Sequence, residues 1–147
     1  MIRYWYRSHK LLAICADVCA GMMHLESKGL VHGHLTPTHI LLDGNLNAKI
    51  CSARGPCHPA LLRYSAPESI LSVSLNRKIL VTRYVQNNFS FASDAWAFSV
   101  TSWEILDQCR QCPYEGFSNE EIVKNAERIV SGDPDAVSYL TQQNNFF

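Results

Sequence analysis

The chain has 147 residues, of which 13 are Lys or Arg and 13 are Asp or Glu, so its formal charge is zero with neutral histidines. Hydrophobic residues make up 47% of the chain and charged residues 18%, a composition that predicts one domain with a buried core. The balanced charge argues against nucleic-acid binding, because massed Lys and Arg supply most of the affinity for a phosphate backbone. No run of about 20 apolar residues occurs, so we expect no membrane contact by this segment.

Residues 11–23 follow three basic residues and could be taken for a cleaved signal peptide, but a helix explains them better. Asp17 lies inside the apolar stretch, which disfavours a signal. Apolar residues recur at intervals of three and four, the period of one helical stripe, up to a stop at Gly29. The stripe consists of Leu11, Cys15, Val18, Met22 and Leu25. The sequence therefore predicts an amphipathic helix.

A hairpin is predicted next. Two short apolar runs, residues 40–42 and 48–51, flank Asp43, Gly44 and Asn45, which tolerate the positive φ of a tight reversal. Residues 51–59 contain one glycine and two prolines, so they predict an irregular loop.

Two further helices follow. Residues 93–106 begin at Ser93 or Ser90, either of which can cap a helix, and carry apolar side chains on nearly every face. Such a helix is normally buried all round. Ser118 and Glu121 form a capping box that opens the last helix. Its expected inner face consists of Ile122, Val123, Ala126, Ile129 and Val130. Its acidic face is open to two interpretations, a solvated surface or a docking surface.

Six cysteines, at positions 15, 19, 51, 57, 109 and 112, permit disulfides without establishing them. Zinc is a second possibility, since thiolate and imidazole are good zinc ligands. The candidate ligands are His32, His34, His39, His58, Cys51 and Cys57. Their spacing differs from the short ligand pairs of structural zinc sites, and Cys109 and Cys112 lack a second C-x-x-C pair. The sequence therefore predicts no metal site, and Cys15 and Cys19 are expected to be small core residues.

In this order, the segments resemble the C-terminal lobe of a protein kinase of the tyrosine-kinase type. Residues 89–106, with Asp94 and Trp96, resemble its buried central helix, and residues 109–126 are similar to the matching segment of discoidin domain receptor tyrosine kinases. Residues 62–68, with Ala66, Pro67 and Glu68, resemble the substrate-side loop, with Tyr64 where Trp is usual.

The resemblance implies a mainly α fold with a small β-hairpin, an incomplete kinase C-terminal lobe of the α+β class. The resemblance spans roughly residues 11–130. We assign the partial kinase-like lobe to residues 1–130, with an insertion at about 72–88, and expect the polar tail, 131–147, to be poorly ordered. The resemblance also implies that Asp94 hydrogen-bonds the backbone of the catalytic loop, and that Glu68 lacks the arginine supplied by later helices. Asp43 is expected to form the hairpin turn.

The catalytic motifs of the family are degenerate here. A kinase catalytic loop reads H-R-D-x-x-x-x-N. The corresponding stretch begins at His32, with Gly33 at the Arg position, His34 at the Asp position and His39 at the Asn position. Ser52 stands at the metal-binding Asp of D-F-G. The resemblance therefore implies that ATP and magnesium, the cofactors of the family, are not bound here, and we expect none.

The leading hypothesis is a catalytically inactive, pseudokinase-like segment that acts as a binding or regulatory module of a receptor tyrosine kinase-like protein, on its cytoplasmic side. Its expected partner is another protein or an N-terminal lobe, which would cover Leu30, Val31, Leu41 and Ile50. One alternative is a fragment of an active receptor tyrosine kinase, with His34 as the base. Another is an incomplete gene model in which residues 72–88 are translated non-coding sequence.

Overall fold

The computed structural model describes residues 2–51, 59–74 and 89–136. Within these ranges the secondary-structure elements, in chain order, are α1 (Ile2–Ser27), η1 (Pro37–His39), β1 (Ile40–Leu42), β2 (Ala48–Ile50), η2 (Pro59–Tyr64), α2 (Pro67–Ser74), α3 (Phe91–Leu106) and α4 (Asn119–Val130). The predicted mainly α fold with a small β-hairpin is confirmed. Most of the expected insertion, residues 75–88, lies outside the described residues, as do residues 137–147.

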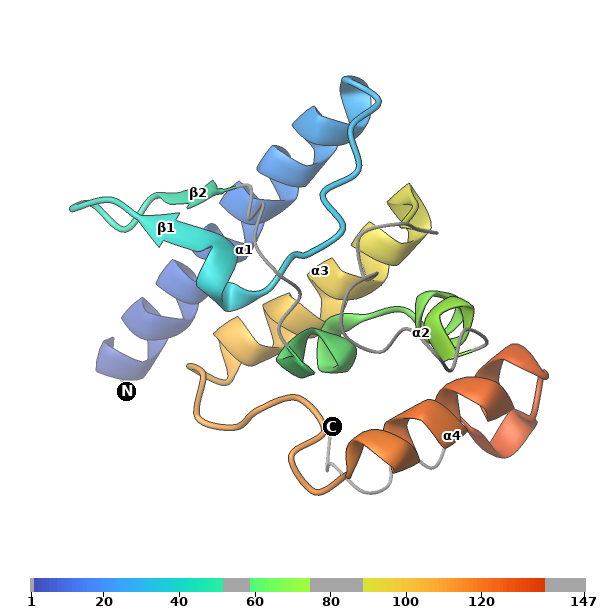
Figure 1. Ribbon diagram of the computed structural model, residues 1–147. Coiled ribbons are helices and arrows are strands. Elements are labelled where there is room, and N and C mark those ends of the chain that lie inside the picture. The colour runs from blue at the N-terminus through green and yellow to red at the C-terminus, as the bar shows by residue number, and fades with distance from the viewer. Residues whose placement is uncertain (1, 52–58, 75–88, 137–147) are drawn as a thin grey trace.

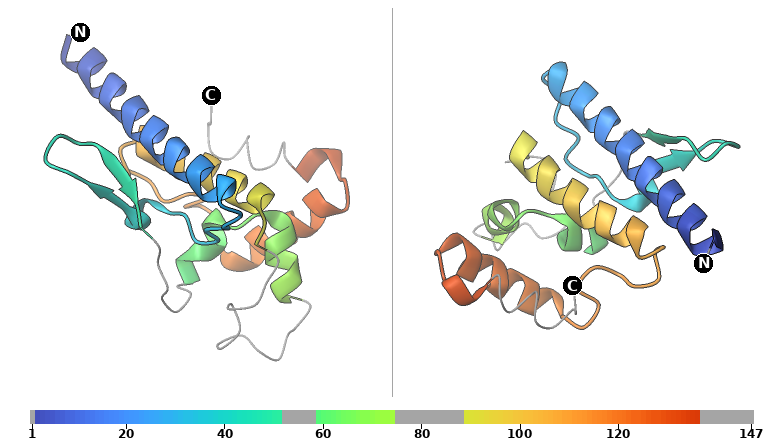
Figure 2. Two further views of the ribbon diagram at one scale, coloured as in Figure 1. Left: turned by 90° about the horizontal axis from the view of Figure 1, so that it is seen from above. Right: turned by 180° about the vertical axis from the view of Figure 1, so that it is seen from behind.

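The helices form layers around α3. Helix α1 packs on one side of α3 and carries the hairpin, while α2 and α4 pack against each other on the opposite side (Figures 1 and 2). One buried cluster joins α1, the hairpin and α3, and a second joins α2 and α4. The first cluster contains Ile14, Val18, Leu35, Ala48, Ala97 and Ile105. The second contains Ile70, Phe117, Ile122 and Ala126.

Helix α1 is longer than its apolar stripe. It begins at Ile2, nine residues before Leu11, and no Gly or Pro interrupts the residues between them. The predicted stripe does face the core, and Val18 is 1% exposed. The hairpin accounts for an acidic residue inside the apolar stretch of α1. The Asp17 carboxylate accepts a hydrogen bond from the Ala48 backbone N–H of β2 at 2.9 Å. No helix among the described residues is long and apolar enough to span a membrane.

The hairpin lies where it is predicted, but its turn differs. The strands are antiparallel and pair Ile40 with Ile50 and Leu42 with Ala48. The residue with positive φ is Leu46, at 64°, and not one of residues 43–45. The Asp43 carboxylate holds the turn by accepting hydrogen bonds from the backbone of Asn45 and Asn47, at 2.8 and 2.9 Å. This side-chain bonding, rather than glycine flexibility, closes the reversal.

Helix α3 uses both predicted capping serines. Ser90 is the N-cap, and its hydroxyl oxygen accepts a hydrogen bond from the Ser93 backbone N–H, while the Ser93 hydroxyl oxygen accepts one from the Ser90 backbone N–H. The expectation of burial on all sides is wrong, since Phe91 and Leu106 are 40% and 45% exposed. The buried positions are mostly small or polar: Ser93, Asp94, Ala97, Thr101, Glu104 and Ile105. Small side chains on this face allow the loop before η1 to approach the helix closely.

Helix α4 has the predicted Ser118–Glu121 capping box. Ile122 and Ala126 are buried as expected, whereas Val130 is 53% exposed. Its neighbour Ile129 still faces α2, since it lines a cavity with Pro67 and Ile70. Past the helix, Arg128 Nε donates to Asp133 Oδ2 at 2.7 Å and Ala136 is fully buried. The first residues after α4 therefore remain in contact with the rest of the fold.

Candidate functional site

The loop of residues 32–36, between α1 and η1, is fixed to α3 through its backbone. The Asp94 carboxylate accepts one hydrogen bond from the His32 N–H and another from the Gly33 N–H, both at 2.8 Å. Farther along, the Thr101 hydroxyl donates to the Leu35 carbonyl oxygen at 3.4 Å, and Leu35 is fully buried. Both carboxylate oxygens of Asp94 are thus engaged by the backbone, which is the structural role that the resemblance implies for this residue.

Gly33 suits its place for a steric reason. Its φ is +76°, a conformation that residues with a side chain rarely adopt. A β-carbon at this position would also lie 3.1 Å from the Phe89 ring. The local backbone therefore favours glycine over a long side chain.

His32 connects the loop to the end of β2. Its Nδ1 accepts a hydrogen bond from the His34 backbone N–H at 3.2 Å, so Nε2 carries the proton that is donated to the Cys51 carbonyl oxygen at 3.1 Å. Burial lowers the pKa of His32, although the Cys51 hydrogen bond and the Asp94 charge oppose that shift. The imidazole is therefore neutral and fully occupied as a structural link.

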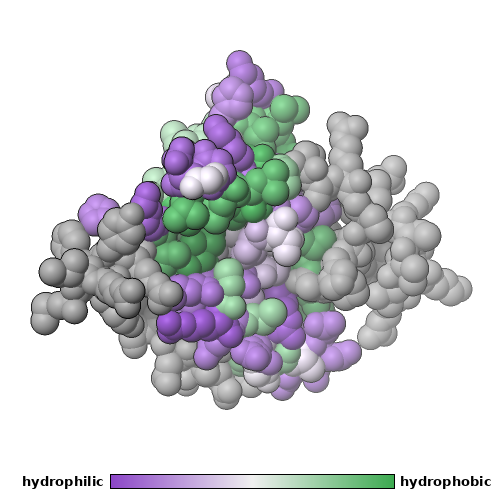
Figure 3. All heavy atoms as spheres, turned by 90° about the vertical axis from the view of Figure 1, so that its left-hand side faces the viewer, coloured by the Kyte–Doolittle hydropathy of each residue, from purple (hydrophilic) through white to green (hydrophobic). Residues whose placement is uncertain are grey.

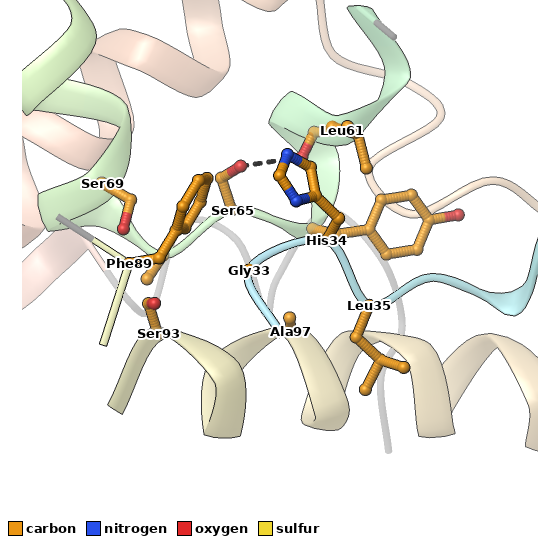
Figure 4. Close-up of a pocket in the computed structure, with 11 residues that line it drawn as sticks. Gly33, His34, Leu35, Leu61, Ser65, Ser69, Phe89, Ser93 and Ala97 are labelled. Carbon is orange, nitrogen blue, oxygen red and sulfur yellow. Dashed lines mark hydrogen bonds between the residues drawn. The ribbon is translucent and has the colours of Figure 1, made fainter. Parts of the chain in front are cut away.

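His34 faces a small cavity between the loop and the segment before α2 (Figure 4). Its ring lies 5.1 Å from the Phe89 ring, at 54° between their planes. Burial is the main cause of a lowered pKa for His34, so its imidazole is neutral near pH 7. The cavity measures about 20 Å³, which is room for about one water molecule. Ser65, on the far wall, donates its hydroxyl proton to the Leu61 carbonyl oxygen at 2.8 Å.

His39 completes the trio of histidines. Its Nδ1 lies 3.2 Å from the Thr36 hydroxyl, which is 2.8 Å from the Thr38 hydroxyl. The rings of His39 and His32 are 6.0 Å apart. Across the described ranges, no three His, Cys, Asp or Glu side chains converge as a metal ion would require. Ser52, Cys57 and His58 lie outside those ranges, and the other five cysteines are free thiols.

A family model for protein tyrosine and serine/threonine kinases matches residues 5–134. This chain belongs to the protein kinase family. Discoidin domain-containing receptor A of Caenorhabditis elegans is 49% identical over 127 residues, which cover 86% of this chain and 15% of that protein. Discoidin domain-containing receptor tyrosine kinase B of the same organism is 29% identical over 125 residues, covering 85% of this chain and 16% of that protein. Human epithelial discoidin domain-containing receptor 1 is 30% identical over 122 residues, 79% of this chain and 13% of that protein.

The predicted similarity to tyrosine kinases of the discoidin domain receptor type is confirmed. The chain spans about one seventh of the length of these relatives. By the order of the family's motifs, the loop of residues 32–39 corresponds to the catalytic loop, and the segment before α2 corresponds to the substrate-side loop. The described part of this catalytic loop does not fit magnesium, a hard cation that prefers oxygen ligands, because its only nearby carboxylate, Asp94, is committed to the backbone.

The substrate-side loop of this kinase chain is held by Tyr64. Its hydroxyl donates to the Glu104 carboxylate of α3 at 2.6 Å, and both residues are buried. Burial and the Glu104 carboxylate raise the pKa of Tyr64 well above its usual range. Sequence reasoning placed Tyr64 at a Trp position but missed Glu104, because a carboxylate on a helix gives no signal of a partner 40 residues away.

The structural role of Arg63 was also not predicted from the sequence. Its guanidinium donates to the carbonyl oxygens of Pro113, Tyr114 and Phe117, in the segment that leads into α4. This one side chain satisfies three backbone acceptors and ties the substrate-side loop to that segment. By contrast, Glu68 of the Ala66-Pro67-Glu68 motif is exposed and forms no ion pair with any described residue.

Proposed function

We propose that this kinase segment does not transfer phosphate and serves as a binding or regulatory module of a receptor tyrosine kinase-like protein, on its cytoplasmic side. The observation that carries the proposal is the pair of half-buried imidazoles at the positions where the family has its Asp and Asn. His34 has a pKa lowered by burial, and His39 lies 3.2 Å from the Thr36 hydroxyl through its Nδ1.

Phosphoryl transfer depends mainly on stabilising the charge that develops on the transferred group, which magnesium does in this family. Magnesium requires oxygen ligands, usually one or two carboxylates besides the phosphates. The loop supplies imidazole nitrogen at both positions, and the Asp94 oxygens are occupied by two backbone N–H groups. Moving Asp94 toward a metal would break both hydrogen bonds, so it cannot replace the lost ligand without loss of the loop.

The alternative is an active receptor tyrosine kinase in which His34 acts as the base. One observation favours it, because His34 lines the cavity next to the substrate-side loop, within reach of a hydroxyl placed there. Its lowered pKa makes the imidazole a weaker base, however, and a base alone does not stabilise the transferred phosphoryl group.

A module of this kind needs a surface for its partner. Exposed leucines of the hairpin, Leu41, Leu42 and Leu46, are 59%, 49% and 47% exposed, and Leu30 and Val31 are 56% and 39% exposed. Figure 3 shows apolar residues gathered on the face toward the hairpin. Ile50 was also predicted to be covered by a partner, but it packs against Gly21 of α1. Contiguous exposed apolar surface commonly marks a protein contact.

The decisive experiment incubates the purified chain with radiolabelled ATP, magnesium and a tyrosine-containing peptide. We expect no incorporation above a heat-killed control, and the His34→Ala variant should be indistinguishable from the parent. Magnesium-dependent incorporation that His34→Ala abolishes would overturn the proposal in favour of the active enzyme. His24→Ala, a change at an exposed histidine of α1, is the matched control for loss of an imidazole.

Nucleotide binding is tested separately by thermal shift. A ligand at 100 times its dissociation constant stabilises a protein by about 2.7 kcal/mol, which is a rise of several degrees in Tm. We expect ATP with magnesium to leave the Tm unchanged. A saturable upward shift would contradict the expected loss of the cofactors even if the chain proved inactive.

A further inference from the structure

A second cavity lies between α2, α3 and α4, on the side of α3 away from α1. Most of its wall is apolar and includes Pro67, Ile70, Ile122 and Ala126. Three of these belong to the buried cluster that joins α2 to α4. The cavity measures about 20 Å³, close to the room that a single water molecule requires.

Two polar atoms that belong to residues lining this apolar space have no hydrogen-bond partner in the described part of the chain. They are the indole Nε1 of Trp96 and the side-chain Oδ1 of Asn125, and both are buried. Asn125 is only 4% exposed. Buried polar atoms in native proteins nearly always have a partner, either protein or ordered water. Because Trp96 and Asn125 line the same cavity, one polar group held there can serve both atoms.

The two atoms are chemically complementary. The indole N–H can only donate a hydrogen bond, and the amide oxygen can only accept one. A third group is also present, because Ser65 lines the same cavity and uses its proton on the Leu61 carbonyl oxygen, which leaves the Ser65 oxygen able to accept. The occupant must therefore accept one hydrogen bond and donate up to two.

We propose that the cavity holds one ordered water molecule that accepts a hydrogen bond from Trp96 Nε1 and donates to Asn125 Oδ1 and Ser65 Oγ. Three hydrogen bonds are typical of a buried water. A partner's carboxamide side chain would offer the same donor and acceptor groups, but its carbon stem needs more room than about 20 Å³. The water joins α4 to α3 and to the substrate-side loop through polar bonds, in addition to their apolar contacts.

A high-resolution crystal structure of the 147-residue chain, with a solubility fusion if required, tests the site directly. We expect density for one water within hydrogen-bond distance of Trp96 Nε1 and Asn125 Oδ1. In solution, the Trp96 indole N–H should show a magnetisation-transfer peak to water, which Asn125→Leu removes. Density for a larger group, or Trp96 Nε1 bonded to another protein atom, would overturn the proposal.

A double-mutant cycle supplies an independent measurement. Trp96→Phe or Asn125→Leu alone leaves the other group unpaired and should lower the folded-to-unfolded ratio about 5- to 150-fold. Together they remove both polar ends, so the combined loss should be smaller than the product of the two. The control cycle pairs Trp96→Phe with Ser102→Ala, whose buried hydroxyl lies outside this cavity, and should be multiplicative. A multiplicative Trp96–Asn125 cycle would contradict the bridge, and if Trp96→Phe does not fold, the crystal structure decides.

Discussion

The catalytic loop and the substrate-side loop face each other across the small cavity at His34, yet they are held in different ways. The catalytic loop is anchored by its backbone, through Asp94 and Thr101, while the side chains of His34 and His39 remain half-buried. The substrate-side loop is anchored by its own side chains, Arg63 and Tyr64, which reach partners 40 to 54 residues away. The side chains of His34 and His39 can thus be substituted without loss of the loop's shape. Arg63 and Tyr64 cannot, because their side chains are what hold the substrate-side loop in place.

The largest effect is expected at Asp94. Asp94→Ala leaves two backbone N–H groups of the catalytic loop without their charged acceptor, and should lower the free energy of unfolding by about 3 kcal/mol, measured by urea denaturation. Asp43→Ala is the control, since Asp43 also accepts backbone hydrogen bonds but lies in an exposed turn. Equal losses at the two positions would show that the loop is not anchored through Asp94.

The second largest loss of stability is expected for Tyr64→Phe. It removes the donor from the Glu104 carboxylate, which is 8% exposed, and should lower the free energy of unfolding by about 2 kcal/mol. Tyr114→Phe is the control, because burial is the only cause that raises the pKa of Tyr114. A loss at Tyr114 as large as at Tyr64 would assign the effect to burial of the ring rather than to the Glu104 hydrogen bond.

The same substitution has a signature at alkaline pH. Burial and Glu104 raise the pKa of Tyr64 in the folded state, whereas in the unfolded state it ionises near pH 10. The folded state therefore retains a proton that the unfolded state releases, so this stabilisation is complete below about pH 10 and declines as the pH rises further. Tyr64→Phe should show a shallower decline than the parent in equilibrium unfolding between neutral and alkaline pH.

Gly33→Arg restores the family's residue and should nevertheless destabilise the chain. The positive φ at Gly33 costs a residue with a side chain about 1–2 kcal/mol, and the new β-carbon must displace the Phe89 ring. Gly44→Ala is the control, since its φ is not positive and no atom lies near its β-carbon position. An unchanged or increased midpoint of denaturation for Gly33→Arg would contradict the steric account of this position.

The smallest expected effect is the contribution of His32 to the loss of stability at acidic pH. Burial lowers the pKa of His32 in the folded state, so the unfolded state binds a proton at a higher pH than the folded state does. The stability that depends on neutral His32 is present above the unfolded pKa, about 6.5, and is lost as the pH falls below it. His32→Gln keeps a donor for the Cys51 carbonyl oxygen and should flatten this decline between pH 7 and pH 5. His24→Gln, at an exposed position of α1, is the control for the loss of an imidazole.

Local signals in the sequence predicted the local structure well. The three-and-four spacing located α1, the apolar runs located the hairpin, and Ser90, Ser93, Ser118 and Glu121 act as caps. The burial of α3 was predicted wrongly, because the apolar composition of a helix does not tell which side its neighbours occupy. Its hydrogen bonds to the catalytic loop are made by the polar side chains of Asp94 and Thr101, which hydropathy does not single out.

The candidate site was predicted in part. The residues at the catalytic positions follow from motif spacing, and His32, His34 and His39 do lie together in one loop. The network that holds the opposite loop does not follow from it, since Arg63 and Glu104 act on partners far along the chain. Hydrogen bonds between distant segments depend on tertiary packing, which has no periodic signature in the sequence.

The three carbonyl contacts of Arg63 also bear on the order in which the molecule folds. The segment that they hold includes left-handed backbone at Gln108, Cys109 and Tyr114, none of which is glycine. Such conformations are unfavourable in an isolated chain, and the contacts that offset them join residues 50 to 54 apart. Closing a loop of that length is slow compared with forming α3 or α4. We therefore expect the segment between these helices to reach its final shape only after the substrate-side loop has docked.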